Sequence, residues 1–234
     1  MPIGARYQAV ATLLCRAAVA PSPRQEVLIR PSPVPARPGV YAWYFREVPP
    51  GVPVHGFNRH AGLALLYVGI SPSKPPLNGK SPSKQSLAAR VRYHFACNAE
   101  GSTLRLKLGC LLGDQLGIGL SRVGSGSPYT FTNPGEIRLD TWLEQNATVC
   151  WVEHPQPWEL EEQLLKTVSL PLNIDGNDLH PFIGTLRACR RAARAAADEG
   201  QCVTDSGGPR RFRVASVQAI SAIKVDCGCP PARC

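Results

Sequence analysis

The sequence has few aromatic residues, no long apolar run and a shortage of acidic side chains. Phe, Trp and Tyr make up 7% of the 234 residues, whereas Pro and Gly number 23 and 21. This composition predicts a compact core of modest size surrounded by much irregular structure. No window approaches the ~18 consecutive apolar residues that a membrane span needs, so we expect no membrane segment.

The acidic shortage leaves 26 Lys and Arg against 17 Asp and Glu, a formal charge of +9. Such an excess suits a polyanion partner, commonly nucleic acid, although it also fits an uncommitted basic surface. The nine cysteines are odd in number and mostly scattered. They favour reduced thiols and a cytoplasmic protein over a disulfide framework. Cys227, Cys229 and Cys234 lack a matching second pair, so we expect no zinc site there unless Cys202 joins them.

Alternating loop-rich and periodic segments predict one α/β domain at residues 38–198. Residues 1–37 are a Pro-rich, partly flexible segment that includes a linker or edge segment, and 199–234 form a disordered tail. The domain is expected to hold a small, mainly antiparallel three-stranded sheet flanked by helices. Strands are predicted at 39–45, 63–70 and 148–154, and helices at 86–95, 102–112, 137–147, 158–168 and 184–200. Long loops occupy 46–62 and 71–84, and 129–132 form a short strand.

Two of the predicted strands carry the same pair of residue types. Gly39 precedes Tyr41 in GVY, and Tyr67 precedes Gly69 in YVG. A hairpin that pairs these strands can point both tyrosines to one face. The glycines then let the backbone approach a phosphate that a side chain would block. Taken singly, each tyrosine is also compatible with an ordinary strand aromatic.

Later residues extend this pattern. Leu87, Arg90 and His94 fit L-x-x-R-x-x-x-H on one predicted helix, and Glu161 precedes Asn173 by about a dozen residues with Pro171 between them. Over roughly residues 38–180, this order of motifs resembles the GIY-YIG nuclease domain. The resemblance implies a metal-dependent endonuclease that hydrolyses phosphodiester bonds in DNA. It implies an active site formed by Tyr41, Tyr67, Arg90, His94, Glu161 and Asn173.

The same residue types suit phosphodiester hydrolysis on chemical grounds. The Glu161 carboxylate is a hard oxygen ligand for Mg²⁺ or Mn²⁺, which would stabilise the departing oxygen. The planar fork of Arg90 matches phosphate oxygens. Tyr67, beside a metal and an arginine, could accept the proton of the attacking water, with Tyr41 supporting it.

Each role has a competitor in the sequence. Arg92 rivals Arg90 for the phosphate, and Glu159 and Glu162 rival Glu161, although the spacing to Asn173 selects Glu161. His94 is either a packed helix residue or a partner that fixes a tyrosine or the phosphate. Asn173 is compatible with merely pinning the chain after its helix.

The chain also departs from the family pattern. Long loops separate the motifs, and Ile70 stands where several relatives carry a phosphate-binding lysine; Lys74, Lys80 or Lys84 could substitute. These departures favour an alternative, a catalytically inactive nucleic-acid-binding module of the same fold. A protein-interaction domain with an incidental basic face is a third hypothesis.

The last predicted helix carries a row of like charges at i, i+3, i+4 and i+7. Its members are Arg187, Arg190, Arg191 and Arg194. Four cations on one helical face repel one another unless a polyanion is near, which predicts contacts to a nucleic-acid backbone. The alternative is the solvated face of an Ala-rich helix.

Overall fold

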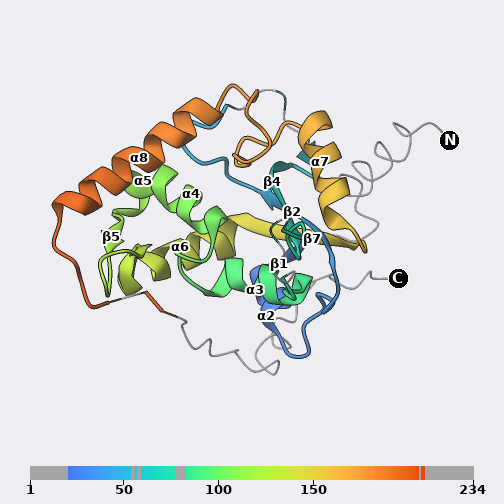
Figure 1. Cartoon of the computed structure of the whole chain (residues 1–234), viewed down its shortest axis with the longest axis horizontal. Helices are drawn as coiled ribbons and strands as arrows, with labels where there is room; N and C mark the ends of the chain where they lie inside the picture. Colours follow the sequence, from blue (N-terminus) through green and yellow to red (C-terminus); the bar gives the residue numbers. More distant parts are fainter. Residues whose placement is uncertain are drawn as a thin grey trace, which may run out of the picture.

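The computed structural model describes residues 21–53, 56, 59–76, 78, 83–205 and 207–208. In this part of the chain an antiparallel sheet lies among helices, with α8 along one side and α7 on another (Figure 1). Every helix in the described ranges is too short or too polar to cross a membrane. The cysteines described are all free thiols.

The sheet contains the three predicted strands as its long members. These are β2 (Gly39–Phe45), β4 (Leu63–Ser71) and β7 (Ala147–Glu153). Two-residue strands add to the edges, β1 (Ser22–Pro23) beside β7 and β3 (Arg59–His60) beside β4. The order is β1-β7-β2-β4-β3, so the predicted antiparallel core is confirmed and the prediction of three strands misses the short edges.

Strand β2 lies at the centre of the sheet, and all its residues are buried. One face carries Tyr41, Trp43 and Phe45, which belong to the larger apolar core. The opposite face carries alternate residues such as Tyr44, and helix α7 (Pro157–Thr167) packs on it through Leu160 and other apolar side chains. The sheet is therefore covered on both sides, which explains its nearly continuous apolar strands.

Beside α7, the helices of the described residues are α2 (Arg24–Leu28), α3 (Leu87–Ala96), α4 (Thr103–Leu111), α5 (Gly113–Leu116), α6 (Thr132–Asn146) and α8 (Ile183–Glu199). The five predicted helices are present in order as α3, α4, α6, α7 and α8, and the short helices α2 and α5 were not predicted. The predicted start of α6 at 137 is wrong by five residues. Pro134 suggested a loop, but proline is tolerated in a first helical turn, where amide hydrogens have no partner within the helix. The short strands β5 (Ser121–Arg122) and β6 (Tyr129–Thr130) pair before it.

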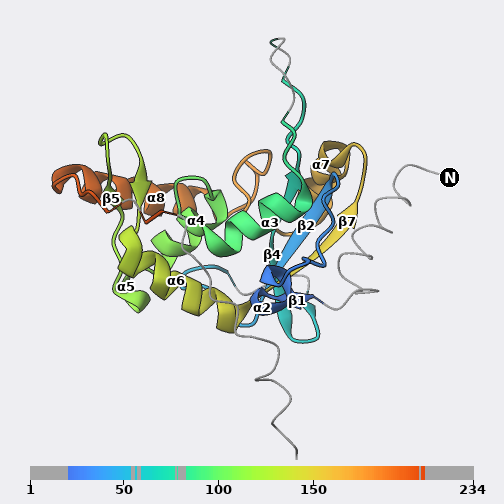
Figure 2. The same cartoon turned by 90° about the horizontal axis from the view of Figure 1, so that it is seen from below.

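The flanking segments contribute to the fold where they are described. The Pro-rich segment supplies β1 and the buried Arg24, while residues 1–20 lie outside the described residues. At the other end, Val203 bridges Val123, and a carboxylate oxygen of Asp205 accepts a hydrogen bond from the Asn133 amide at 2.7 Å. Residues 209–234 also lie outside. The described ends of the 71–84 loop project beside α3 and α7 (Figure 2).

A buried ionic network holds α4 and α6 together. Arg105 and Glu136 are both fully buried, and the Arg105 guanidinium donates to Glu136 Oε2 at 2.6 and 3.0 Å. It also donates to Asp140 Oδ1 at 2.7 Å, and Asp140 accepts from Arg24. Glu136 Oε1 accepts from the Ala99 amide at 2.8 Å. With these bonds in place, neither charge is left unpaired, which is the condition for burying an ion pair.

Removing one member should therefore unfold the protein readily. We expect Glu136→Ala to lower the free energy of unfolding by about 3–5 kcal/mol, because Arg105 is left as an uncompensated buried charge. Urea denaturation measures the change. The control is Glu199→Ala at the exposed end of α8, which should stay within about 0.5 kcal/mol of the parent. Equal losses in the two variants would contradict the role of the network.

Candidate active site

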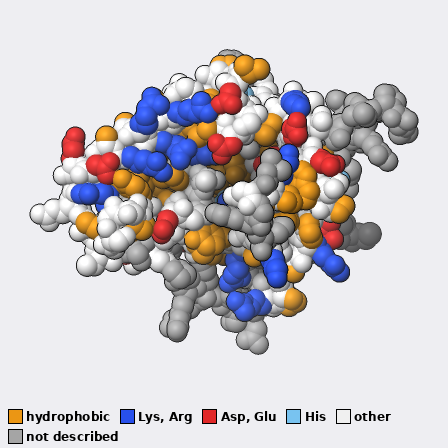
Figure 3. All heavy atoms as spheres, viewed as in Figure 1, with side chains coloured by type: hydrophobic (Ala, Val, Ile, Leu, Met, Phe, Trp, Pro, Cys, Tyr) orange, Lys and Arg blue, Asp and Glu red, His pale blue; other side chains and the backbone are white. Residues whose placement is uncertain are grey.

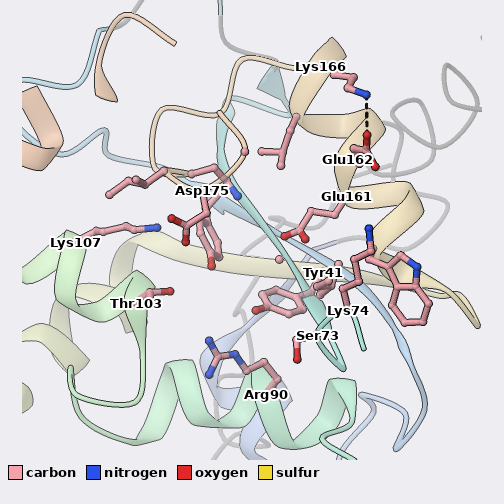
Figure 4. Close-up of a pocket in the computed structure, with 18 residues that line it drawn as sticks. Tyr41, Ser73, Lys74, Arg90, Thr103, Lys107, Glu161, Glu162, Lys166 and Asp175 are labelled. Carbon is pink, nitrogen blue, oxygen red and sulfur yellow. Dashed lines mark hydrogen bonds and ion pairs between the residues drawn. The ribbon is translucent and has the colours of Figure 1, made fainter. Parts of the chain in front are cut away.

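The residues predicted to carry chemistry converge on one open cleft with a volume of about 520 Å³. Its lining brings together side chains from β2, β4, α3, α4, α7 and the segment after α7 (Figure 4). The predicted site residues that line it are Tyr41, Tyr67, Arg90, Glu161 and Asn173. The sixth, His94, lies behind the lining in contact with Tyr41.

The register of β2 and β4 puts the tyrosines side by side. Tyr41 lies opposite Gly69, and Trp43 lies opposite Tyr67. The two phenol rings therefore occupy one face, with centroids 6.5 Å apart. The predicted hairpin and the shared face of its tyrosines are confirmed.

The two motif glycines have packing reasons, which differ from the predicted one. A Cβ at Gly69 would overlap the Tyr41 phenol, so this glycine makes room for the ring. A Cβ at Gly39 would overlap the Val152 carbonyl and a Leu87 methyl, away from the cleft. The prediction that Gly39 admits a phosphate is therefore wrong, because its Cβ side faces β7 and α3.

His94 is fully buried and holds Tyr41. Its Nε2 lies 2.9 Å from the Tyr41 hydroxyl, and its Nδ1 lies 2.7 Å from Ser102 Oγ. Burial, with the nearby charges of Arg90 and Lys107, keeps the pKa of His94 well below 6.5. The ring is thus neutral, with one donor and one acceptor for its two hydrogen bonds. Of the two readings of His94, the geometry favours the partner that fixes a tyrosine.

Burial raises the pKa of both tyrosines, but unequally. The Tyr41 hydroxyl has a pKa well above 10, because burial and the neighbouring Tyr67 disfavour its anion. The pKa of Tyr67 is also raised by burial, but a hydrogen bond with Thr103 and the charge of Arg90 lower it. The Tyr67 anion is therefore disfavoured less than the Tyr41 anion, so Tyr67 is the better proton acceptor of the two.

Arg90 and Glu161 approach the cleft from opposite sides (Figure 4). Arg90 Nη1 donates to the Gly101 carbonyl at 3.0 Å, which orients the guanidinium. Burial, reinforced by the charge of Asp175, raises the pKa of Glu161 to about 7. Among the described residues no cation forms an ion pair with the Glu161 carboxylate. The site therefore offers a largely buried carboxylate with unused oxygen lone pairs.

The alternative candidates for the roles of Arg90 and Glu161 lie outside the cleft or are already hydrogen-bonded. Arg92 borders a separate hollow with Ser86 and Pro31. Glu159 is exposed in the first turn of α7. Glu162 borders the cleft, but its carboxylate accepts a hydrogen bond from Lys166 at 2.8 Å.

Asn173 completes the open edge of β4. Its Oδ1 accepts from the Val68 amide at 2.9 Å, and its Nδ2 donates to the Val68 carbonyl at 2.8 Å. The side-chain amide thus imitates a neighbouring strand, while the Leu172 amide donates to the Leu66 carbonyl at 3.0 Å. This geometry favours the reading in which Asn173 pins the chain after α7.

Sequence reasoning missed several polar residues of the cleft, among them Thr103, Lys107 and Asp175. Lys107 is the most unusual, since its ammonium lies 5.0 Å from the Tyr67 ring centroid and the residue is only 4% exposed. A lone lysine within the apolar stretch LRLKLGCLL was the available signal. Of the predicted lysine substitutes, Lys74 lines the cleft, Lys84 does not, and Lys80 lies outside the described residues.

The predicted arginine row forms a basic face on α8, comprising Arg187, Arg190, Arg191 and Arg194. Lys and Arg side chains gather over this helix in Figure 3. Arg187 pairs with Asp178 at 2.6 Å, and Arg194 lies 5.4 Å from the centroid of the Tyr129 ring. Arg190 is partly buried, and its Nε lacks a hydrogen-bond partner among the described residues.

A family model described as the GIY-YIG catalytic domain matches residues 39–192. The chain belongs to this family. The match spans every element that builds the cleft and most of α8, and membership indicates a nuclease-type function with a nucleic-acid substrate. No curated protein and no solved structure gives a significant match.

The raised pKa of Glu161 makes a prediction about stability in this GIY-YIG domain. A carboxyl whose folded pKa is about 7 binds its proton more tightly when folded, so its stabilising effect is full below the unfolded pKa. That effect is lost as the pH rises toward 7. As the pH rises from 5 to 8, we expect the free energy of unfolding of Glu161→Gln to increase by about 1–3 kcal/mol relative to that of the parent. Urea denaturation without divalent ions measures this change.

Glu162→Gln provides the matched control on the same helix. The hydrogen bond from Lys166 lowers the pKa of Glu162, so this carboxyl is ionised in both states across that pH range. The difference in free energy of unfolding between Glu162→Gln and the parent should therefore stay constant from pH 5 to 8. A pH-independent difference for Glu161→Gln as well would show that Glu161 is not protonated near neutral pH.

Proposed function

We propose that this protein is a metal-dependent endonuclease that hydrolyses phosphodiester bonds in DNA. The observation that carries this proposal is the convergence of Tyr41, Tyr67, Arg90 and Glu161 on one cleft. These residues come from four elements, and a packing role alone does not require their polar atoms to meet. Together they provide proton acceptors, a fork for phosphate oxygens and a carboxylate.

The donor set of the cleft fits a divalent cation. The described residues contain no group of three or more His, Cys, Asp or Glu side chains that would enclose an ion. Mg²⁺ and Mn²⁺, however, are often held by one or two carboxylates, with water and substrate phosphate completing the shell. Glu161 offers such a carboxylate, and the charge of Asp175 acts on it. When bound there, the ion would act as a Lewis acid and stabilise the departing oxygen.

The protein's own residues would orient the phosphate and take up the proton. Arg90, oriented by the Gly101 carbonyl, donates its remaining N–H groups to the non-bridging oxygens as charge builds on them. Tyr67 accepts the proton of the attacking water, since Thr103 and Arg90 offset part of the effect of burial on its pKa. Tyr41, held by His94, orients the water, and Asn173 fixes the strand edge beneath them.

The basic face of α8 would bind the backbone of the same substrate. Its arginines lie on the α4 side of the cleft, where the charge of Arg190 acts on Lys107. Contacts of this kind give affinity without sequence preference. The protein would therefore bind DNA without preference for a particular base sequence.

Plasmid nicking tests the proposal. We expect wild-type protein to nick supercoiled plasmid with Mg²⁺ or Mn²⁺ and to stop when EDTA removes the ion. Arg90→Ala should reduce the rate on the order of 10²–10³, by analogy with the loss of one oxyanion donor. Glu161→Ala should abolish the metal-dependent rate. Arg92→Ala and Glu159→Ala are the matched controls on the same helices and should retain activity.

Two outcomes would decide against catalysis. Equal nicking by all variants would mean that the activity comes from a contaminant. Salt-sensitive DNA binding that Glu161→Ala leaves unchanged, with no nicking by the wild type, would support the inactive nucleic-acid-binding module. Absence of DNA binding at low salt would instead point to a protein-interaction domain.

Binding assays test the basic face separately from catalysis. We expect Arg191→Ala and Arg194→Ala each to weaken duplex DNA binding equally for different sequences. Each should also lower the slope of log affinity against log salt by about 0.9, the value for one phosphate contact. Fluorescence anisotropy measures both quantities. Unchanged slopes in both variants would mean that the row is a solvated helix face.

A further inference from the structure

Lys107 is a buried cation that forms no ion pair with any residue the structure describes. It lies one turn into α4, is 4% exposed and borders the cleft. The Lys107 ammonium lies over the face of the Tyr67 ring, 5.0 Å from its centroid. In Figure 4 its side chain reaches from α4 into the cleft, toward Asp175.

Burying an ammonium without a hydrogen-bonded counter-ion is costly. Burial, together with the charge of Arg190, accordingly lowers the pKa of Lys107 to about 8. Asp175 and Glu161 act on it in the opposite direction through space, and Arg90 repels it. Lys107 thus borders the cleft as a buried ammonium with no ion pair to Asp175 or Glu161, which is the arrangement expected when a ligand supplies the missing anion.

We propose that Lys107 binds a backbone phosphate of the nucleic-acid strand in the cleft. Lys107 stands on the α4 side of the tyrosines, and Arg190 acts on it from α8. A phosphate at Lys107 would therefore lie between the scissile phosphate at Arg90 and the basic face of α8. The strand would leave the cleft along this line. This inference rests on the proposed function, because it uses the same substrate.

The competing role is that of a counter-ion. In that case Lys107 would only offset the charges of Asp175 and Glu161, and a bound strand would not touch it. The two roles differ in their effect on binding, since a phosphate contact releases counter-ions from DNA whereas an internal counter-ion does not.

The experiment uses full-length protein carrying Glu161→Gln, so that DNA is not cut, with EDTA present. A fluorescein-labelled DNA duplex of roughly 20 base pairs is titrated at several salt concentrations between about 50 and 300 mM. Lys107→Met is compared with Lys107→Arg, which keeps the charge. Arg46→Met is the control, because Arg46 is exposed beyond the far end of β2 and its loss changes the net charge equally. Urea denaturation confirms that each variant is folded.

We expect Lys107→Met to weaken binding about tenfold or more and to lower the salt slope by about 0.9. Lys107→Arg should retain most of the DNA affinity and of the salt slope. Arg46→Met should match the parent in both quantities. A folded Lys107→Met variant with unchanged slope would overturn the role of Lys107 while leaving the proposed function intact. Absence of DNA binding by the Glu161→Gln parent at low salt would overturn both.

Discussion

The hydrogen bond between the Tyr41 hydroxyl and His94 Nε2, 2.9 Å long, is the interaction on which the cleft depends. His94 also meets Ser102, which caps α4 by accepting from the Arg105 amide at 3.1 Å. One buried imidazole thus joins β2, α3 and the start of α4. Because burial keeps the ring neutral, its single donor and single acceptor satisfy both partners. A protonated ring would have to donate to both hydroxyls, and burial disfavours its charge.

The same buried groups position two of the cations that line the cleft, Arg90 and Lys107. Arg90 lies one turn before His94 on α3, and Lys107 lies just over one turn after the Ser102 cap on α4. Arg105 then secures both helices, since it donates to the His94 carbonyl at 3.3 Å and to Glu136. Side chains that face the cleft are therefore held by polar pairs buried behind them. This is the kind of support that a site needs when its geometry matters to a fraction of an ångström.

The sequence was sufficient for those parts of the fold that local patterns determine. The Gly and Tyr pairs marked the β2–β4 hairpin. The resemblance to the family's motifs singled out Arg90 and Glu161, which the structure brings to one cleft. The sequence did not predict the position of Lys107 in the cleft or the strand-like hydrogen bonding of Asn173. Both depend on contacts across more than 35 residues, to Tyr67 and Val68 on β4. The start of α6 was missed because a proline in a first turn resembles a loop in sequence.

The free edge of β4 explains how Glu161 reaches the tyrosines at all. Helix α7 packs on the face of the sheet opposite to Tyr41 and Tyr67, so its side chains would ordinarily be separated from them by the strands. Among the described residues, however, strand β3 pairs only with Leu63 and Ala64 of β4. The Asn173 side chain and the Leu172 amide satisfy the backbone of Val68 and Leu66 in place of a whole strand, which leaves space beside β4. The carboxylate can then enter the cleft past the edge of the sheet, where a full neighbouring strand would have blocked it.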